Sequence, residues 1–231
     1  MSGPDGLMVS IHIPKTGGGS FRSILEAYAE GHFQRDYADR PLAPGTVRQR
    51  FRLATSRPRL EPGTRVVHGH FIATKYWRRY PDARYVAWFR DPVERLASHY
   101  HYWKRSPDLE HPTCRRLIDE DLSLQAFAAL PEMRDVQARL LGEVPVERLD
   151  FAGLTERYDD SLELFRRIFA PSLEVKTKPR HVNVEREGER YQIDPAVRSA
   201  IRELNRSDVQ LYADAQARFA ALAAEHGMAR P

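Results

Sequence analysis

Apolar residues along the chain follow two spacings, one typical of strands and one typical of helices. Strand-like runs, rich in β-branched residues or nearly continuous in apolar ones, occupy residues 7–13, 65–71, 84–89 and 149–153. Apolar positions recur at helical spacing over residues 21–28, 122–130, 134–141, 155–169, 195–204 and 207–224. Strands that alternate with helices in this way predict an α/β fold, a three-layer sandwich in which helices flank a parallel sheet.

Local signals sharpen the boundaries of these elements. The sequence DPVE at 91–94 places Asp at the N-cap, Pro at the first helical position and Glu at the third. A helix over 91–103 is therefore expected directly after the third strand. Asp-Pro at 194–195 repeats this helix start. The Pro-, Gly- and Arg-rich segment 40–63 predicts an irregular excursion between the first helix and the second strand.

Length and composition narrow the class of protein. The 231 residues suit a single domain over 1–231, and 42% hydrophobic with 29% charged residues is typical of a globular chain. Cys114 is the single cysteine, which excludes an internal disulfide and a cysteine zinc cluster. The first strand begins too near Met1 for a signal peptide, and no apolar run reaches the length of a membrane span. These features predict a cytoplasmic protein.

Charge adds one local feature. The net charge of +4 favours anionic partners in general. An excess of arginine falls within the predicted irregular segment, at Arg48, Arg50, Arg52, Arg57 and Arg59. A solvated loop is the simplest interpretation of these arginines, and a docking surface for an acidic acceptor is the second. Nucleic acid is the third, and no recognisable nucleic-acid-binding motif supports it.

The sequence PKTGGGS at 14–20 stands between the first strand and the first helix. Glycines allow backbone N–H groups to converge on an anion, and a helix N-terminus adds unsatisfied donors and positive potential. Only five of the 36 Lys and Arg residues are lysines, and Lys15 lies in this turn, where a compact ammonium suits a single phosphate oxygen. Because the lysine precedes the glycines, the turn is not the GxxxxGK[ST] loop of nucleoside triphosphatases. It predicts a phosphate loop for another class of ligand.

Histidines supply the candidate base. His68 and His70 flank a glycine in the second strand and therefore lie on one face of it. Histidine suits a general base near neutral pH, although the same spacing also occurs in metal sites. No third metal ligand is evident, so we expect no metal. His99 and His101 point to different faces of a helix, which predicts ordinary helix-surface residues.

Three elements together resemble the sulfotransferases that use 3′-phosphoadenosine 5′-phosphosulfate (PAPS). They are PKTGGGS after the first strand, HGH in the second and FRDPVERLASHY after the third. The resemblance is to the carbohydrate branch that includes the heparan sulfate 2-O-sulfotransferases, in a bacterial, cytosolic form without a membrane anchor. GLTERYDDSLELF and RSDVQLYADAQARF extend it more loosely, so that it covers most of the chain in order.

This resemblance implies roles for particular residues. The 5′-phosphosulfate would bind to the loop, at Lys15, Thr16, Gly17, Gly18, Gly19 and Ser20. The 3′-phosphate would bind to Arg90 and Ser98. His68 and His70 would supply the catalytic base, and we favour His70. Arg180 is the candidate within a basic loop over the cofactor. Gly19 departs from the pattern, because the family usually has a hydroxyl residue there.

The function expected from the resemblance is transfer of a sulfuryl group from PAPS to a hydroxyl of a saccharide or other small metabolite. The resemblance does not decide whether this acceptor is acidic. The P-loop-like sulfotransferase fold is the corresponding fold, and no metal is required. Two alternatives belong to other classes. A nucleotide-dependent kinase would need a GK[ST] loop, which the chain lacks, and a non-catalytic module that binds a nucleotide or polyanion would not need the histidine pair.

Overall fold

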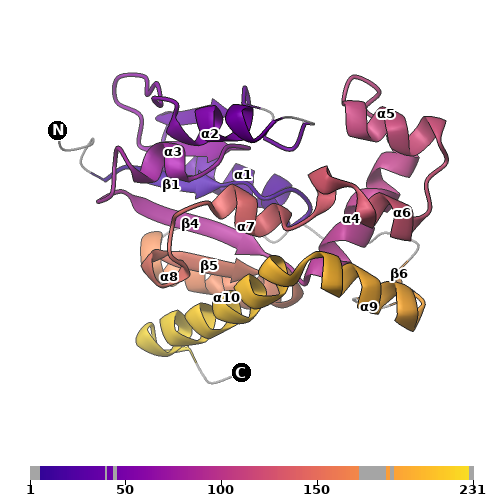
Figure 1. Ribbon diagram of the computed structural model, residues 1–231. Helices are drawn as coiled ribbons and strands as arrows, with labels where there is room; N and C mark the ends of the chain where they lie inside the picture. Colours follow the sequence, from indigo (N-terminus) through magenta and orange to yellow (C-terminus); the bar gives the residue numbers. More distant parts are fainter. Residues whose placement is uncertain (1–5, 40, 44–45, 172–185, 188–189, 229–231) are drawn as a thin grey trace.

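A computed structural model describes residues 6–39, 41–43, 46–171, 186–187 and 190–228 (Figure 1). Its centre is a sheet of five parallel strands in the order β2-β3-β1-β4-β5. The strands are β1 (Met8–Ile11), β2 (Phe33–Asp36), β3 (Val66–Gly69), β4 (Arg84–Phe89) and β5 (Phe151–Leu154). The predicted parallel sheet is confirmed, and the four expected strands are all present in it.

Helices cover both faces of the sheet. On one face lie α1 (Gly18–Ala29) and α8 (Tyr158–Phe169), joined by the edge-to-face contact of Phe21 with Phe165 at 4.9 Å between ring centroids. On the other lie α3 (Thr74–Trp77) and α7 (Val136–Leu141), and α10 (Arg206–Glu225) runs along β5. The three-layer α/β architecture predicted from the sequence is therefore confirmed.

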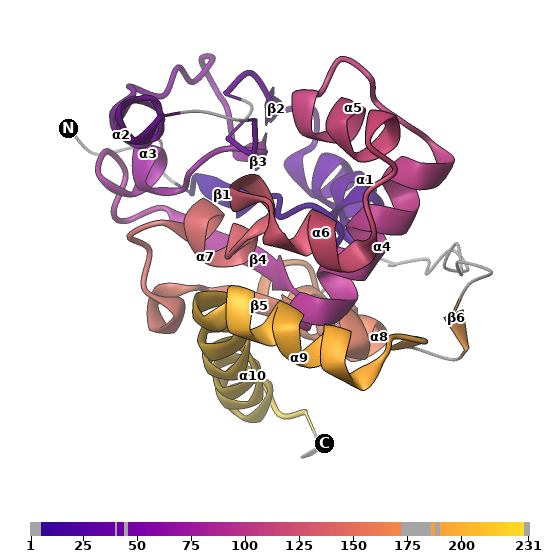
Figure 2. The ribbon, with the colours of Figure 1, turned by 45° about the vertical axis from the view of Figure 1, so that its right-hand side comes forward.

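A second group of helices stands beside the sheet, at the carboxyl end of β4 (Figure 2). It consists of α4 (Pro92–Arg105), α5 (Pro112–Asp119), α6 (Leu124–Ala129) and α9 (Pro195–Leu204). These helices enclose a second hydrophobic core, separate from the core around the sheet. The second core includes Trp103, Cys114, Phe127, Met133 and Ile201. Because α4 follows β4 almost at once, this group forms a wall next to the carboxyl ends of the strands.

Shorter elements complete the described part of the chain. Single 3₁₀ turns occur at Pro131–Met133, Val146–Arg148 and Thr155–Arg157. A separate antiparallel pair consists of β6 (Arg186–Glu187) and β7 (Arg190–Tyr191).

The irregular excursion predicted over 40–63 is wrong in part, because it contains α2 (Val47–Thr55). The sequence held a signal for this helix. Thr46 Oγ1 accepts from the backbone N–H of Gln49 at 3.2 Å, and the Gln49 side chain accepts from the N–H of Thr46 at 2.8 Å, which is a capping box. Arg48, Arg50 and Arg52 thus belong to a helix rather than a loop. Among the strands and α-helices, β2, α3, α5, β6 and β7 also have no counterpart in the prediction. β2 is a short polar edge strand without the usual apolar alternation.

At the start of α4, Asp91 caps the helix as predicted, whereas Glu94 takes no part in the cap. The Asp91 carboxylate accepts from the N–H groups of Val93 at 2.9 Å and Glu94 at 3.1 Å. Glu94 does not reach back to the cap. Its carboxylate binds Arg198 at 3.0 Å and the N–H of Tyr191 at 3.0 Å, so it fastens α4 to α9 and β7.

Candidate functional site

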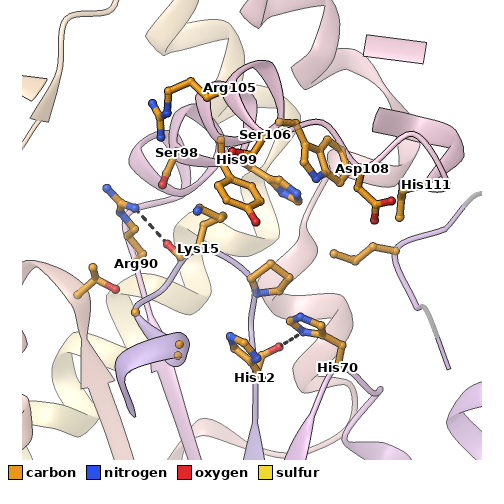
Figure 3. A pocket seen from close by; sticks show the side chains of 18 of the residues that line it. His12, Lys15, His70, Arg90, Ser98, His99, Arg105, Ser106, Asp108 and His111 are labelled. Atoms are coloured by element: carbon orange, nitrogen blue, oxygen red, sulfur yellow. Dashed lines mark hydrogen bonds between the residues drawn. The ribbon is translucent and has the colours of Figure 1, made fainter. Parts of the chain in front are cut away.

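A cavity of about 860 Å³ lies between the carboxyl ends of the strands and α4. The loops after β1, β3 and β4 contribute one side of it, and α4 with the segment that follows contributes the other. Figure 3 shows the side chains that converge there. The predicted site residues that line it are Lys15, Gly17, Gly18, Gly19, His70, Arg90 and Ser98.

The glycine-rich loop turns directly into α1. Gly17, at φ 92°, is the N-cap, so the first N–H groups of the helix have no partner within the helix. A Cβ on Gly18 would lie 2.2 Å from the His12 ring, whereas one on Gly19 would meet nothing within 4 Å. A side chain at position 18 would therefore clash with His12, whereas position 19 has room for one. Thr16 is fully buried and its hydroxyl donates to the Ile13 carbonyl at 2.8 Å, so its side chain shapes the loop instead of lining the cavity.

Lys15 is a largely buried ammonium in this site, and it has no acidic partner among the described residues. Its backbone adopts φ 69°, a conformation uncommon for a residue other than glycine. The ammonium lies over the ring of Tyr102, 3.9 Å from the centroid, and makes no ion pair with any described residue. Burial, and then the charges of Arg90 and Arg105, lower the pKa of Lys15 to about 8. An anion in the cavity would relieve this repulsion and favour the charged form.

Arg90 directly follows β4, and neighbouring residues hold both its side chain and its backbone. Its Nη1 donates to the Lys15 carbonyl at 3.1 Å, and its Nε lies 3.9 Å from Glu156 Oε1. The Gln137 side chain binds the Arg90 backbone twice, accepting from its N–H at 3.0 Å and donating to its carbonyl at 2.8 Å. Ser98 lies one to two turns along α4 and lines the same cavity (Figure 3). Arg90 and Ser98 therefore line the same cavity as the glycine-rich loop.

The structure separates the two predicted histidines. His68 is 1% exposed, is hydrogen-bonded through Nδ1 to Ser10 Oγ at 2.9 Å and does not line the cavity. His70 lines it, and its Nδ1 lies 2.6 Å from the carbonyl oxygen of His12. A carbonyl can only accept, so Nδ1 of His70 carries the proton and the neutral ring has its lone pair on Nε2. Burial lowers the pKa of His70 below its usual value, so the ring is neutral at pH 7.

His12 is the functional candidate that sequence reasoning missed. Its ring is stacked between those of His68 and His70, at centroid distances of 4.8 and 4.3 Å, and burial with its histidine neighbours lowers its pKa to about 2. The parallel register pairs Ile11 with Gly69, so the residues that follow them, His12 and His70, lie side by side. The signal in the sequence was a histidine directly after each of two strands, β1 and β3, which pair in the sheet.

Tyr37 completes this cluster from the end of β2. Its hydroxyl is hydrogen-bonded to His12 Nδ1 at 2.8 Å, and its ring meets the His70 ring edge-on at 4.8 Å. The flanking carboxylates of Asp36 and Asp39 both bind the buried ammonium of Lys75, at 2.8 and 2.9 Å. This clamp fixes the segment that carries Tyr37, and through it the ring that packs on His70.

The α4 side of the cavity corrects one expectation. His99 was expected on the helix surface, but it is 4% exposed, packs 4.1 Å from the Trp103 ring and lines the cavity. His99 is buried because α4 packs against neighbouring elements on more than one face, so few of its residues in this part are exposed to solvent. His101, two residues on, does point elsewhere and stacks on Tyr191 at 5.0 Å. Trp103 belongs to the core of the second helix group and also lines the cavity, and Trp77 packs on Tyr85 beside the sheet.

Some predicted features lie outside what the structure describes. The side chain of Ser20 is not described, although its backbone belongs to the first turn of α1. Arg180 and the segment 176–183 are outside the described residues. Within the described ranges, no group of three or more His, Cys, Asp or Glu residues could hold a metal ion. None of the helices in those ranges is both long and apolar enough to cross a membrane.

Comparison with known proteins gives distant matches among solved structures. No family model matches the chain, and no curated protein matches it. Among solved structures, the chain is similar to a sulfotransferase from Alicyclobacillus acidocaldarius, with 17% identity over 95% of this chain and 96% of that one and a TM-score of 0.47. A likeness this distant assigns neither a family nor an activity to the chain.

Proposed function

We propose that this protein is a sulfotransferase that moves a sulfuryl group from PAPS to a hydroxyl of a saccharide or other small metabolite. One observation carries the proposal. The ammonium of Lys15, which has no ion pair among the described residues, lies between the Arg90 and Ser98 side of the cavity and the histidine cluster (Figure 3). A site that joins anion-binding groups to a neutral base suits group transfer from an anionic donor to a hydroxyl.

The residues present fit such a donor. The loop offers unsatisfied N–H groups at the start of α1, and its ammonium, whose pKa is lowered by burial and by two arginines, would gain from an anionic partner. In our proposal these groups hold the 5′-phosphosulfate, which supplies the sulfuryl group when bound. Arg90 and Ser98 recognise the 3′-phosphate, because a guanidinium matches phosphate oxygens and a hydroxyl adds a donor.

His70 is the proposed base. As the acceptor oxygen bonds to sulfur, the bond between sulfur and the bridging phosphate oxygen breaks, and the hydroxyl proton passes to Nε2 of His70. Lys15 stabilises the negative charge that develops on the departing phosphate. His68 does not line the cavity, so its proposed role is to support the histidine stack from beneath.

Binding of two nucleotides tests the proposal. Hydrogen bonds to a charged group contribute about 1.5–3 kcal/mol each. Adenosine 3′,5′-bisphosphate should therefore bind at least tens of times more tightly than adenosine 5′-monophosphate in calorimetry. Arg90→Ala should remove most of this preference while scarcely changing affinity for the monophosphate. Arg84→Ala, at the exposed opposite end of the same strand, is the matched control and should keep it. Equal binding of the two nucleotides, or a preference for ATP, would show that the proposal is wrong.

A further inference from the structure

The two ends of the cavity differ in charge. In Figure 3, Arg90 and Arg105 lie at one end, Asp108 lies at the other, and Lys15 lies between them. Among the residues that the structure describes, Asp108 is the only acidic side chain that lines the cavity. In the proposed function the cationic end is filled by the donor, which leaves the Asp108 end for the acceptor.

Asp108 is held in place without being neutralised. Its Oδ1 accepts from the N–H of Glu110 at 3.2 Å, and its carbonyl accepts from the N–H of His111 at 3.0 Å, so a local turn orients the side chain. Neither contact involves a cation, and the carboxylate makes no ion pair with any other described residue. Its negative charge therefore remains available to a molecule in the cavity.

Asp108 is itself exposed, and the cavity that it lines has apolar walls as well as the imidazole of His111, which lies beside Asp108 in Figure 3. Leu42 and Trp103 are 8% and 6% exposed and line this cavity, as does His99. Burial holds the pKa of His99 well below its usual value, so its imidazole is neutral and adds no positive charge. An acceptor here meets aromatic and aliphatic surface together with one carboxylate.

We infer that the acceptor is a hydroxyl compound with an apolar or aromatic body and no negative charge, and that Asp108 selects for an ammonium or another hydrogen-bond donor on it. This inference rests on the proposed function. An anionic acceptor would place its charge near Asp108, while the cations of the cavity are already engaged by the phosphates of the donor. Repulsion between like charges disfavours such a ligand, and attraction favours a cationic one. The site thus discriminates by charge as well as by shape.

Three phenols of matched size test the inference: tyramine, 4-ethylphenol and 4-hydroxyphenylacetate, which carry an ammonium, a methyl and a carboxylate. Their Kd values are measured by calorimetry on protein saturated with adenosine 3′,5′-bisphosphate. We expect tyramine to bind at least tenfold more tightly than the carboxylate compound, with 4-ethylphenol between them. Asp108→Asn should reduce the tyramine affinity to that of 4-ethylphenol, and Asp108→Lys should reverse the order.

Glu110→Gln is the matched control, since this exposed carboxylate lies two residues away and does not line the cavity; it should keep the wild-type order. The Kd for the bisphosphate shows whether each variant is folded. Tightest binding of the carboxylate compound, equal binding of all three, binding of none, or an unchanged order in Asp108→Asn would overturn this inference alone. If the wild-type protein does not prefer the bisphosphate to the monophosphate, the proposed function itself fails.

Discussion

The loop after β1 and the histidine cluster beside it are neighbours with opposite electrostatic states. Lys15 and Arg90 bring positive charge together in a buried setting, and burial, followed by the charges of Arg90 and Arg105, lowers the pKa of Lys15. The rings of His12, His68 and His70 are uncharged and stacked, with a hydrogen bond on one nitrogen of each ring. The first region is incomplete until an anion binds, whereas the second is already assembled. We infer that a bound anion stabilises the charged form of Lys15 and leaves the histidines as they are.

The two regions also have different supports. The backbone of Arg90 is fixed by Gln137, and the helix that carries Gln137 is capped by the buried Asp208, which accepts from the N–H groups of Gln137 and Ala138 at 3.1 and 2.8 Å. His70 is supported instead by His12 and by Tyr37, on the β2 side of the sheet. Substitutions can therefore impair one region while the other stays intact.

The largest effect is expected from His70→Ala. Loss of a general base costs about 10²–10⁴-fold in rate. Turnover should fall within this range, while calorimetry should find nucleotide affinity almost unchanged, because His70 belongs to the preassembled region. His32→Ala, an exposed histidine ahead of β2, is the control and should keep full activity. Loss of turnover on chelation, with recovery on adding zinc, would instead make the histidines metal ligands.

Lys15→Ala tests the other region. Removing a single group that stabilises transition-state charge costs about 10²–10³-fold in kcat. We expect this loss to exceed the loss of affinity for adenosine 3′,5′-bisphosphate, as measured by calorimetry. Lys15→Arg should also be impaired, since a planar guanidinium does not replace a compact ammonium. Lys104→Ala, on the solvent side of α4, is the control; near-normal turnover in Lys15→Ala would contradict the role of the loop.

The pH dependence of binding tests the charge of Lys15 directly. The pKa of Lys15 is about 8 in the ligand-free protein, and a bound anion should raise it. Affinity for the bisphosphate should be flat from neutral pH to about 8 and then fall by up to about tenfold per pH unit. Lys15→Met should lack this decline, and its persistence in that variant would assign the titration to another group.

The same pKa acts in the opposite direction on folding. An unfolded lysine keeps its proton up to a pKa of 10.5, whereas the folded, ligand-free protein loses it near 8. Between these values the unfolded chain binds more protons, so the contribution of Lys15 to stability rises with pH. Chemical denaturation of the wild type and Lys15→Met at several pH values should separate this contribution from other titrations.

The smallest effect is expected from Tyr37→Phe, which removes the hydrogen bond to His12 and keeps the ring against His70. A typical hydrogen bond contributes about 1 kcal/mol, or roughly fivefold in a rate or equilibrium constant. We expect kcat to fall about fivefold with KM for the donor unchanged, because Tyr37 positions and does not bind the donor. Tyr28→Phe, on α1, is the matched control. An effect on KM alone would place Tyr37 in binding rather than in support of the base.

The sequence by itself determined most of the sheet and the proposed anion-binding side of the site. Alternating strands and helices predicted four of the five central strands, because buried parallel strands are nearly continuous in apolar residues. PKTGGGS and the Arg-Asp-Pro junction after β4 carry their information in a few consecutive residues, so each could be recognised locally. The order of elements then brings both to the carboxyl edge of one sheet.

Only the tertiary structure decided which histidine lines the cavity and what surrounds it. His68 and His70 are equivalent by spacing, and their difference in burial comes from Ser10, His12 and Tyr37 on neighbouring strands. The burial of His99 was missed for the same reason. The sequence of α4 does not show that a second hydrophobic core packs against the helix. Contacts between residues far apart in sequence depend on strand order and register, and local periodicity does not encode these. The glycine-rich loop and the preference for His70 as the proposed base could therefore be predicted from the chain, whereas the stacking of His12, the support from Tyr37 and the position of Asp108 could not.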